Sequence, residues 1–319
     1  MVSRSRRVRV TVVFMVDTDS VLVSSFPSAT VDGGYDGSYT RRMARSYGSK
    51  WDALRDHVRP GVKVLDFGCG MPENARLLRD LVEDAGGVYY CHDAHPGVEA
   101  AMCIDGGFRH VNAGDLDEYV GAFDVMFMSS VVHEMLTPAC KPGNVANEGL
   151  FELIGRLVAP SGCLVVRDWA DYAVGAQDGS LPDFLDLVDE GAAREVAQWA
   201  RAMEDNGVIA TGSACVVSSV SPGGWLITGE RESVCEVFLH AVWGLGSIDR
   251  ESQERYCSAA FGSPGGFMTW FYGGRGFAVE DVQVFYDEGF ARHGARLFRL
   301  DSGLPCATKA VTVLRKGVR

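Results

Sequence analysis

Short apolar runs alternate with segments of helical period from residue 61 onward. One helical segment, 74–85, places its leucines on one face and stops at Gly86-Gly87, and a second follows at 147–158. This alternation predicts an α/β protein, a Rossmann-like, mostly parallel sheet with helices on both faces. The expected strands are 62–67, 88–93, 108–113, 123–130, 163–169, 282–287 and 309–316.

The run at 123–130, FDVMFMSS, is almost continuously apolar. A strand buried on both faces of a parallel sheet has this composition, so we expect it at the centre. The last two expected strands are joined by a loop-scale connection instead of a long helix, which predicts that they lie side by side at the end of the sheet.

The alternation stops between Asp171 and about Val279, where two helical patterns, 181–205 and 232–243, take its place. We interpret this as a helical insertion before the last two strands, because strands on both sides of it indicate a return to the same sheet. An independent second domain is the alternative. The expected organisation is a possibly disordered leader at 1–37, a core at 38–172, an insertion at 173–278 and a closing strand pair at 279–319.

The amino terminus has four arginines followed by an apolar stretch from Val10 to Val16. Asp17 and Asp19 interrupt the stretch too early for a secretory signal, and a membrane span needs about 20 apolar residues. A frayed or β-alternating leader is the favoured interpretation. With no other long apolar segment in the sequence, we expect a cytoplasmic protein with no membrane partner.

The formal net charge is −12, from 42 acidic and 30 basic residues. This balance gives no extended basic surface, so a nucleic-acid partner is not favoured. Nine cysteines without a Cys-x-x-Cys pair indicate free thiols in a reducing compartment. The cluster from Cys91 to Cys103 lacks a second ligand pair at zinc-site spacing, and we expect no metal there.

Residues 64–72 read VLDFGCGMP, a strand followed by a glycine turn. Glycines let the backbone approach a ligand closely, and the N–H groups of a following helix favour anionic groups. A dinucleotide fingerprint would need a third glycine or alanine where Glu73 stands, so NAD is disfavoured.

The pattern Asp66-x-Gly68-x-Gly70 resembles the first motif of the class I S-adenosylmethionine-dependent methyltransferases, with Pro72 in place of the usual third glycine. The resemblance implies a seven-stranded sheet with an antiparallel last strand. It also implies that the turn carries the amino-acid end of S-adenosyl-L-methionine and that Asp66 supports it. Proline near a helix start costs little, because its missing N–H would be unpaired anyway.

Later segments match the same family in the same order. The second strand ends at Asp93, where the family places a ribose-binding acid, and the turn at 158–162 precedes the fifth strand as in the family. Asn112 to Asp115 matches the segment that meets the adenine amino group. The cofactor-binding residues that the resemblance implies are Asp66, Gly68, Cys69, Gly70, Asp93, Ala94, Gly114, Asp115, Ser129 and Ser130.

Methyl transfer is an in-line displacement that depends mainly on positioning, and it needs a base only if the acceptor must lose a proton. His133 follows the fourth strand at the ligand-binding edge and is the candidate base; a structural role is the alternative. Glu134 either orients it or begins the next helix. Asp168 lines the acceptor pocket or caps the next segment. A catechol-type metal site would need a carboxylate where Ser129 and Ser130 stand, so no metal is expected.

Two aromatic segments have competing interpretations. The helical stretch 38–58, with Tyr39, Tyr47 and Trp51, is placed as a lid over the cofactor by the resemblance. The segment 265–277, GGFMTWFYGGRGF, either lines the acceptor pocket or packs the insertion against the core.

Together these patterns favour an enzyme, a methyltransferase acting on an oxygen or nitrogen of a small molecule. A catalytically silent, methyltransferase-like binding subunit is the first alternative, since Pro72 departs from the family pattern. An NAD-type oxidoreductase is the second. The sequence leaves the acceptor and the oligomeric state open.

Overall fold

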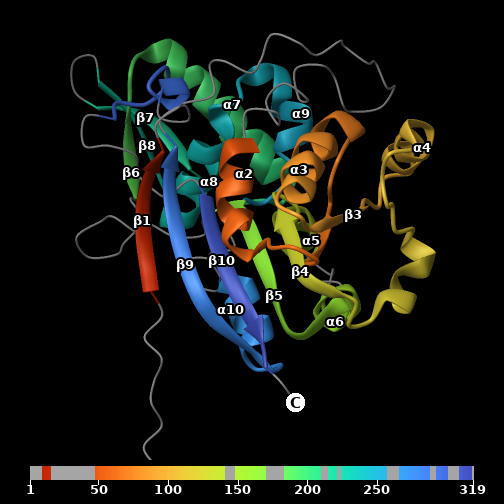
Figure 1. The fold of residues 1–319 in the computed structure, drawn as a ribbon. Helices are drawn as coiled ribbons and strands as arrows, with labels where there is room; N and C mark the ends of the chain where they lie inside the picture. The colour runs from red at the N-terminus through yellow and green to blue at the C-terminus, as the bar shows by residue number, and fades with distance from the viewer. Residues whose placement is uncertain are drawn as a thin grey trace, which may run out of the picture.

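A seven-stranded sheet forms the centre of the chain in a computed structural model (Figure 1). The structure describes residues 9–15, 47–140, 148–169, 183–209, 215–220, 224–256, 266–287, 292–300 and 309–317. The strands lie in the order β1 (Arg9–Met15), β9 (Phe277–Asp287), β10 (Lys309–Lys316), β5 (Val158–Trp169), β4 (Phe123–Ser129), β2 (Lys63–Phe67) and β3 (Val88–His92).

Strand directions confirm the expected mostly parallel sheet with an antiparallel last strand. β10 is antiparallel to both of its neighbours, β5 and β9, and every other neighbouring pair is parallel. β4 lies inside the sheet, and all of its residues except Asp124 are buried. Its continuous apolar run therefore has the predicted cause, burial on both faces.

The expected strand at 108–113 is wrong. This segment makes only an isolated parallel bridge between His110 and Cys91. Two backbone hydrogen bonds flank it, and the chain then turns into the 3-10 helix η3 (Ala113–Tyr119), so the pairing does not extend. The seventh strand is instead β1, which pairs with β9 at the opposite edge. Of the two interpretations of the leader, the β-alternating one holds for residues 9–15.

Helices cover both faces of the sheet, as expected. One face carries α2 (Tyr47–Leu54), followed by η2 (Arg55–His57), with α3 (Pro72–Asp84) and α4 (Pro96–Asp105). The other face carries α5 (Val132–Cys140), α6 (Glu148–Leu157) and α10 (Gly266–Gly273). α3 begins at Pro72. The first N–H groups of a helix have no partner within it, so the N–H that proline lacks costs the helix no hydrogen bond.

The insertion contains a small sheet as well as helices, so its description as mainly helical is incomplete. Three antiparallel strands lie in the order β6 (Phe184–Leu187), β8 (Gly224–Thr228) and β7 (Val216–Val220). The helices are α7 (Glu190–Asp205), α8 (Arg231–Ala241), η4 (Leu245–Ser247) and α9 (Ile248–Glu251). They enclose a second apolar core around Trp199 and Phe238.

The helix expected at 181–205 begins later than predicted. Asp189 caps α7 by accepting a hydrogen bond from the N–H of Ala192 at 2.8 Å, and the residues before it form β6. An aspartate at this position satisfies an N–H group that has no partner within the helix, which sets the helix start.

The described aromatic residues of 265–277 pack in the core. Phe271 and Tyr272 are buried on the α6 side of the main sheet, and the Tyr272 hydroxyl donates to the carbonyl of Phe151. Phe267, Trp270 and Tyr39 fall outside the described side chains, as does Tyr47. Trp51 is partly buried against the apolar cluster on the opposite face.

The cysteines at positions 69, 91, 103, 163, 215 and 235, all within the described ranges, are free thiols. No helix in these ranges is both long enough and apolar enough to span a bilayer.

Candidate active site

The glycine turn after β2 needs glycine for two reasons. Gly68 and Gly70 have φ angles of 78° and 70°, in the left-handed region that side chains disfavour. A Cβ on Gly68 would also lie 2.7 Å from a methyl carbon of Val131. The N–H groups of Gly68 and Cys69 both donate to the carbonyl of His92, at 2.8 and 3.1 Å. The turn is thereby joined to the end of β3.

Asp93 lies directly beside this turn. Its Oδ2 accepts a hydrogen bond from the N–H of Gly70 at 2.9 Å, and its Oδ1 accepts one from the N–H of His95 at 2.9 Å. Each carboxylate oxygen has a second lone pair, so both can still accept from a ligand. Asp93 is half-buried and Ala94 is exposed, which leaves this corner open to solvent.

Asp66 lies in the core beneath the turn. It is buried and accepts a hydrogen bond from the hydroxyl of Tyr89 at 2.7 Å. Burial raises the pKa of Asp66, an effect that the charge of Lys50 partly offsets. Burial likewise lowers the pKa of Lys50. The Asp66 carboxylate therefore bonds to Tyr89 within the core and does not face solvent, and its support of the donor stays a prediction.

The side chain of Cys69 is buried in the core. The thiol is buried, and its interaction with Cys91, together with burial, raises its pKa well above the usual range. Only the backbone of Cys69 is therefore placed to meet a cofactor.

Gly114 and Asp115 begin η3, after the bridge to β3. Asn112 donates its side-chain N–H to Asp115 Oδ2 at 2.9 Å, and no atom lies within 4 Å of a Cβ built on Gly114. The segment is exposed around Gly114 and offers space for a ligand.

Ser129 and Ser130 end the central strand in an unusual conformation. Ser130 has a φ of 57°, which is rare outside glycine and occurs at functional sites. Its hydroxyl accepts a hydrogen bond from Lys309 Nζ at 3.1 Å. Ser129 is buried and accepts from the Arg167 guanidinium at 3.4 Å, which also donates to Ser49. Side chains from β4, β5, β10 and α2 thus meet at this edge.

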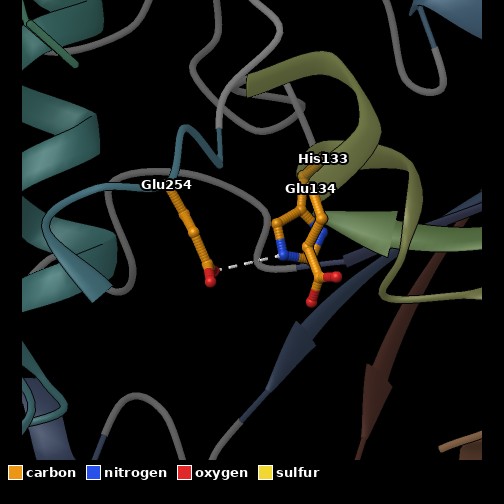
Figure 2. A group of neighbouring side chains, drawn as sticks. All are labelled: His133, Glu134 and Glu254. Atoms are coloured by element: carbon orange, nitrogen blue, oxygen red, sulfur yellow. Dashed lines mark ion pairs between the residues drawn. The ribbon is translucent and has the colours of Figure 1, made fainter. Parts of the chain in front are cut away.

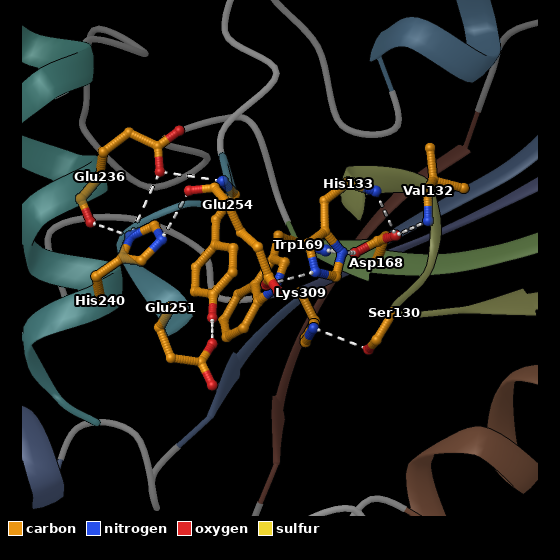
Figure 3. A network of polar contacts seen from close by, with 11 residues as sticks. Ser130, Val132, His133, Asp168, Trp169, Glu236, His240, Glu251, Glu254 and Lys309 are labelled. Carbon is orange, nitrogen blue, oxygen red and sulfur yellow. Dashed lines mark hydrogen bonds and ion pairs between the residues drawn. The ribbon is translucent and has the colours of Figure 1, made fainter. Parts of the chain in front are cut away.

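Asp168 is the partner of His133. Its Oδ1 lies 2.7 Å from His133 Nδ1, and its Oδ2 accepts from the N–H groups of Val132 and His133 at 2.7 and 3.2 Å (Figure 3). One carboxylate thus orients the imidazole and caps the first turn of α5. The expected orienting role belongs to Asp168 and not to Glu134, which lies in the first turn of α5.

Electrostatics make His133 and Asp168 an ion pair at neutral pH. Burial by itself would lower the pKa of His133, but the charge and hydrogen bond of Asp168, with Glu254 beyond, raise it to about 10. Burial would raise the pKa of Asp168, yet the His133 charge holds it well below its usual range. Glu134 keeps an exposed surface; desolvation of its carboxylate, which His133 partly offsets, raises its pKa to about 7.

The insertion reaches this edge through a column of rings. Trp169 of β5 stacks on Tyr256 at a centroid distance of 4.3 Å, and Tyr256 stacks on His240 of α8 at 3.9 Å. Lys309, on β10, places its Nζ 3.5 Å from the centroid of the Trp169 ring (Figure 3). Nothing in the sequence singles out Tyr256, Lys309 or His240, because these residues meet only in the folded chain.

Glu254 is the most important residue that the sequence analysis missed. Its carboxylate lies 3.6 Å from His133 Nε2, and the candidate ligand atoms of His133, Glu134 and Glu254 all lie within 4.8 Å of one another (Figure 2). The surrounding sequence, SIDRESQERY, has the composition of an ordinary charged helix start and gives no signal of this contact. Among the described residues, this group could hold a metal ion where none was expected.

No family model and no curated protein matches the chain. Solved structures similar to it include an S-adenosylmethionine dependent methyltransferase from Mesorhizobium loti, at 15% identity and a TM-score of 0.45 over 84% of this chain and 98% of that one. A SAM dependent methyltransferase from Archaeoglobus fulgidus has 11% identity and a TM-score of 0.43 over 84% and 92%. One described as putative, from Listeria monocytogenes, has 8% identity and a TM-score of 0.42 over 86% and 98%.

Similarity at this level does not assign a function. The strand order establishes the fold class independently. A parallel Rossmann-like sheet with one antiparallel strand, β10, between β5 and β9 is the arrangement that the methyltransferase resemblance implied. The carboxyl ends of β2, β3, β4 and β5 meet at one edge, where open α/β sheets bind ligands.

Proposed function

We propose that the chain is an S-adenosylmethionine-dependent methyltransferase that acts on an oxygen or nitrogen of a small molecule. The observation that carries this proposal is the hydrogen bond from Gly70 N–H to Asp93 at 2.9 Å. It joins a glycine turn suited to the amino-acid end of the donor to a carboxylate suited to its ribose hydroxyls. An extended donor that binds across both strand ends would contact the two groups together.

The remaining predicted residues would contact different parts of the donor or shape its site. Gly114 and Asp115 lie in the first turn of η3, after the segment that bridges to β3, where the adenine would bind. Ser129 and Ser130, at the end of β4, would border the reacting methyl group. Asp66 and Cys69 would act through the shape of the turn, since their side chains are buried.

The acceptor would bind on the side of His133, Glu134 and Asp168. In the reaction, the bond from the sulfonium sulfur to the methyl carbon breaks as the acceptor's bond to that carbon forms, and S-adenosylhomocysteine leaves. An acceptor that starts with a proton releases it to a nearby base or to solvent. Asp168 fixes the position of His133 at this side, and positioning is the main requirement of an in-line displacement.

The formal charge of −12 supports a small acceptor over a nucleic acid. The carboxylates gathered at the site also support it, because Asp93, Glu134 and Glu254 would repel a phosphate backbone.

Calorimetric titration of the purified chain with S-adenosylhomocysteine, beside a labelled methyl-transfer assay on small-molecule fractions, tests the proposal. We expect donor binding that Asp93→Ala weakens at least tenfold, about 1.4 kcal/mol. Asp84→Ala, on the exposed end of α3, is the matched control and should bind like the wild type. Binding without transfer to any fraction would support the silent subunit. Tight NAD binding without donor binding would support the oxidoreductase, and no donor binding at millimolar concentration would refute the proposal.

A further inference from the structure

The group His133, Glu134 and Glu254 combines one imidazole with two carboxylates at a point where two parts of the fold meet. His133 and Glu134 are neighbours in the first turn of α5, while Glu254 follows α9 in the insertion (Figure 2). Their ligand atoms lie within 4.8 Å of one another. Nitrogen and carboxylate ligands sit about 2.0–2.2 Å from a metal ion, so two ligands of one ion are at most about 4.4 Å apart. That limit holds for ligands on opposite sides of an ion, whereas ligands at a right angle are about 3 Å apart, so the three side chains would have to rotate closer together to contact one ion.

The second observation is the partner on the far side of the imidazole. Asp168 Oδ1 lies 2.7 Å from Nδ1, which fixes the ring and directs Nε2 toward Glu254. Metal-binding histidines almost always have their other ring nitrogen bonded to a carboxylate or carbonyl, which sets the tautomer and ring orientation. Asp168 is itself held by backbone N–H groups of Val132 and Trp169, so the ring position is set by the fold.

Charge around the group favours a cation. Three carboxylates, those of Glu134, Glu254 and Asp168, surround one imidazole. The positive charge of Lys309 helps to lower the pKa of Asp168. Its Nζ lies over the Trp169 ring and donates a hydrogen bond to Ser130. The Glu254 side chain is 26% exposed while His133 is 7% exposed, so an ion could enter from solvent and still contact a fixed ligand.

We propose that His133 Nε2 and the carboxylates of Glu134 and Glu254 bind a divalent transition-metal ion, and that Nε2 releases its proton to solvent as the ion binds. One nitrogen and two oxygen ligands suit Mn²⁺ or Fe²⁺ better than a thiolate-preferring ion. Three protein ligands leave coordination positions open, as catalytic metal sites do.

The position of the ion gives it a role that rests on the proposed function. It would lie on the acceptor side of the site, beyond the end of β4, where an acceptor oxygen could occupy an open position. A metal-bound hydroxyl loses its proton more readily, and that proton would pass to solvent as the methyl group is transferred. The acceptor class would then be a small molecule with a metal-binding hydroxyl.

Metal binding can be tested without the donor. The full chain is treated with a chelator, freed of it, and titrated with Mn²⁺, with free Mn²⁺ followed by electron paramagnetic resonance. We expect one site per chain, at least tenfold weaker in Glu254→Gln and in Glu134→Gln. Glu118→Gln, an exposed glutamate on η3, is the matched control and should leave the affinity unchanged.

Two further measurements separate the outcomes. Asp168→Asn should weaken Mn²⁺ binding by about 10- to 100-fold, as is typical when the group that orients a metal ligand is changed, with circular dichroism to confirm folding. No binding at millimolar Mn²⁺, or binding that both glutamine variants leave unchanged, would overturn the proposal. Donor binding without Mn²⁺ binding would overturn the metal site alone, and Mn²⁺ binding without donor binding would overturn the methyltransferase alone.

Discussion

Asp168 Oδ1 lies 2.7 Å from the Nδ1 of His133, with both residues buried at the carboxyl edge of the sheet. The same carboxylate accepts hydrogen bonds from the backbone N–H groups of Val132 and Trp169. It therefore joins the end of β5 to the first turn of α5 as well as orienting the ring. A substitution at Asp168 should affect both the stability of the fold and the site.

Asp168→Ala should lower the free energy of unfolding by about 3–5 kcal/mol, because it removes one partner of a buried ion pair and leaves backbone N–H groups unpaired. Urea denaturation followed by circular dichroism measures this. Asp117→Ala is the control, since the Asp117–Arg156 pair at 3.1 Å is largely exposed and should contribute about 1 kcal/mol or less. Equal losses in the two variants would contradict the buried-pair interpretation.

The same pair predicts how stability depends on pH in the chelator-treated chain. The pKa of His133 is about 10 in the folded chain against 6.5 for the ordinary group. Its contribution is fully present below pH 6.5 and is lost as pH rises toward 10, because the unfolded chain releases the proton first. Urea denaturation at several pH values should show this decline.

Asp168→Asn provides the comparison for the pH experiment. Without the carboxylate charge, the raised pKa of His133 has lost its main cause, so the variant should show a flatter dependence over the same range. An identical slope in wild type and variant would show that another group causes it.

Gly68→Ala and Gly61→Ala form a matched pair. Both glycines have left-handed φ angles, 78° and 81°, so each substitution costs about 1–2 kcal/mol of backbone strain. Only Gly68 has a close neighbour, Val131, at 2.7 Å; a Cβ on Gly61 would meet nothing within 4 Å. Gly68→Ala should therefore lose about 1–3 kcal/mol more, the usual cost of overpacking.

Donor binding separates the two glycine variants further. The methyl group added by Gly68→Ala would collide with Val131, so the turn would have to shift from its position beside Asp93. This shift should weaken S-adenosylhomocysteine binding, while Gly61→Ala should bind it as the wild type does. Calorimetry at a temperature where both variants are folded measures this. Equal affinities would show that the turn does not contact the donor.

The sequence predicted the parts of the fold that depend on local pattern. The bounds of β2, α3 and β4 were predicted closely, because a continuous apolar run marks each buried strand and a helical repeat of apolar residues marks the helix. The β-alternating pattern of β1 was recognised, but its place in the sheet was not predicted because its partner, β9, lies almost at the other end of the chain. The expected strand at 108–113 has a plausible β composition but pairs at a single bridge, which composition does not reveal.

The candidate site divides in the same way. Gly68, Gly70 and Asp93 were predicted from the turn and from the end of the next strand, and the structure bonds Gly70 to Asp93 and Gly68 to the neighbouring His92. Glu254 could not be predicted, because nothing in its local sequence differs from a solvent-exposed charged segment. Its segment is held by long-range contacts: the Glu254 carbonyl lies 3.1 Å from His240 Nε2, and Tyr256 is stacked between Trp169 and His240.

Tyr256 contributes both a stacked ring and a hydroxyl to this segment, and the two contributions can be separated by substitution. Tyr256→Ala removes a ring stacked on both Trp169 and His240, and should lower the free energy of unfolding by about 3–5 kcal/mol. Phe184→Ala is the control within the insertion: Phe184 is 53% exposed and should change stability by about 0.5 kcal/mol or less.

Tyr256→Phe keeps the stacked ring and removes only the hydroxyl that donates to the buried carboxylate of Glu251. We expect a loss of about 1–3 kcal/mol, because a buried charged acceptor is left without this partner. A double-mutant cycle with Glu251→Gln, measured by urea denaturation, should give a coupling energy of about 0.5–3 kcal/mol. Because Glu254 lies in the same segment, Tyr256→Ala should also weaken Mn²⁺ binding more than Tyr256→Phe. Strictly additive effects, with equal Mn²⁺ affinities, would show that the ring column does not order the segment.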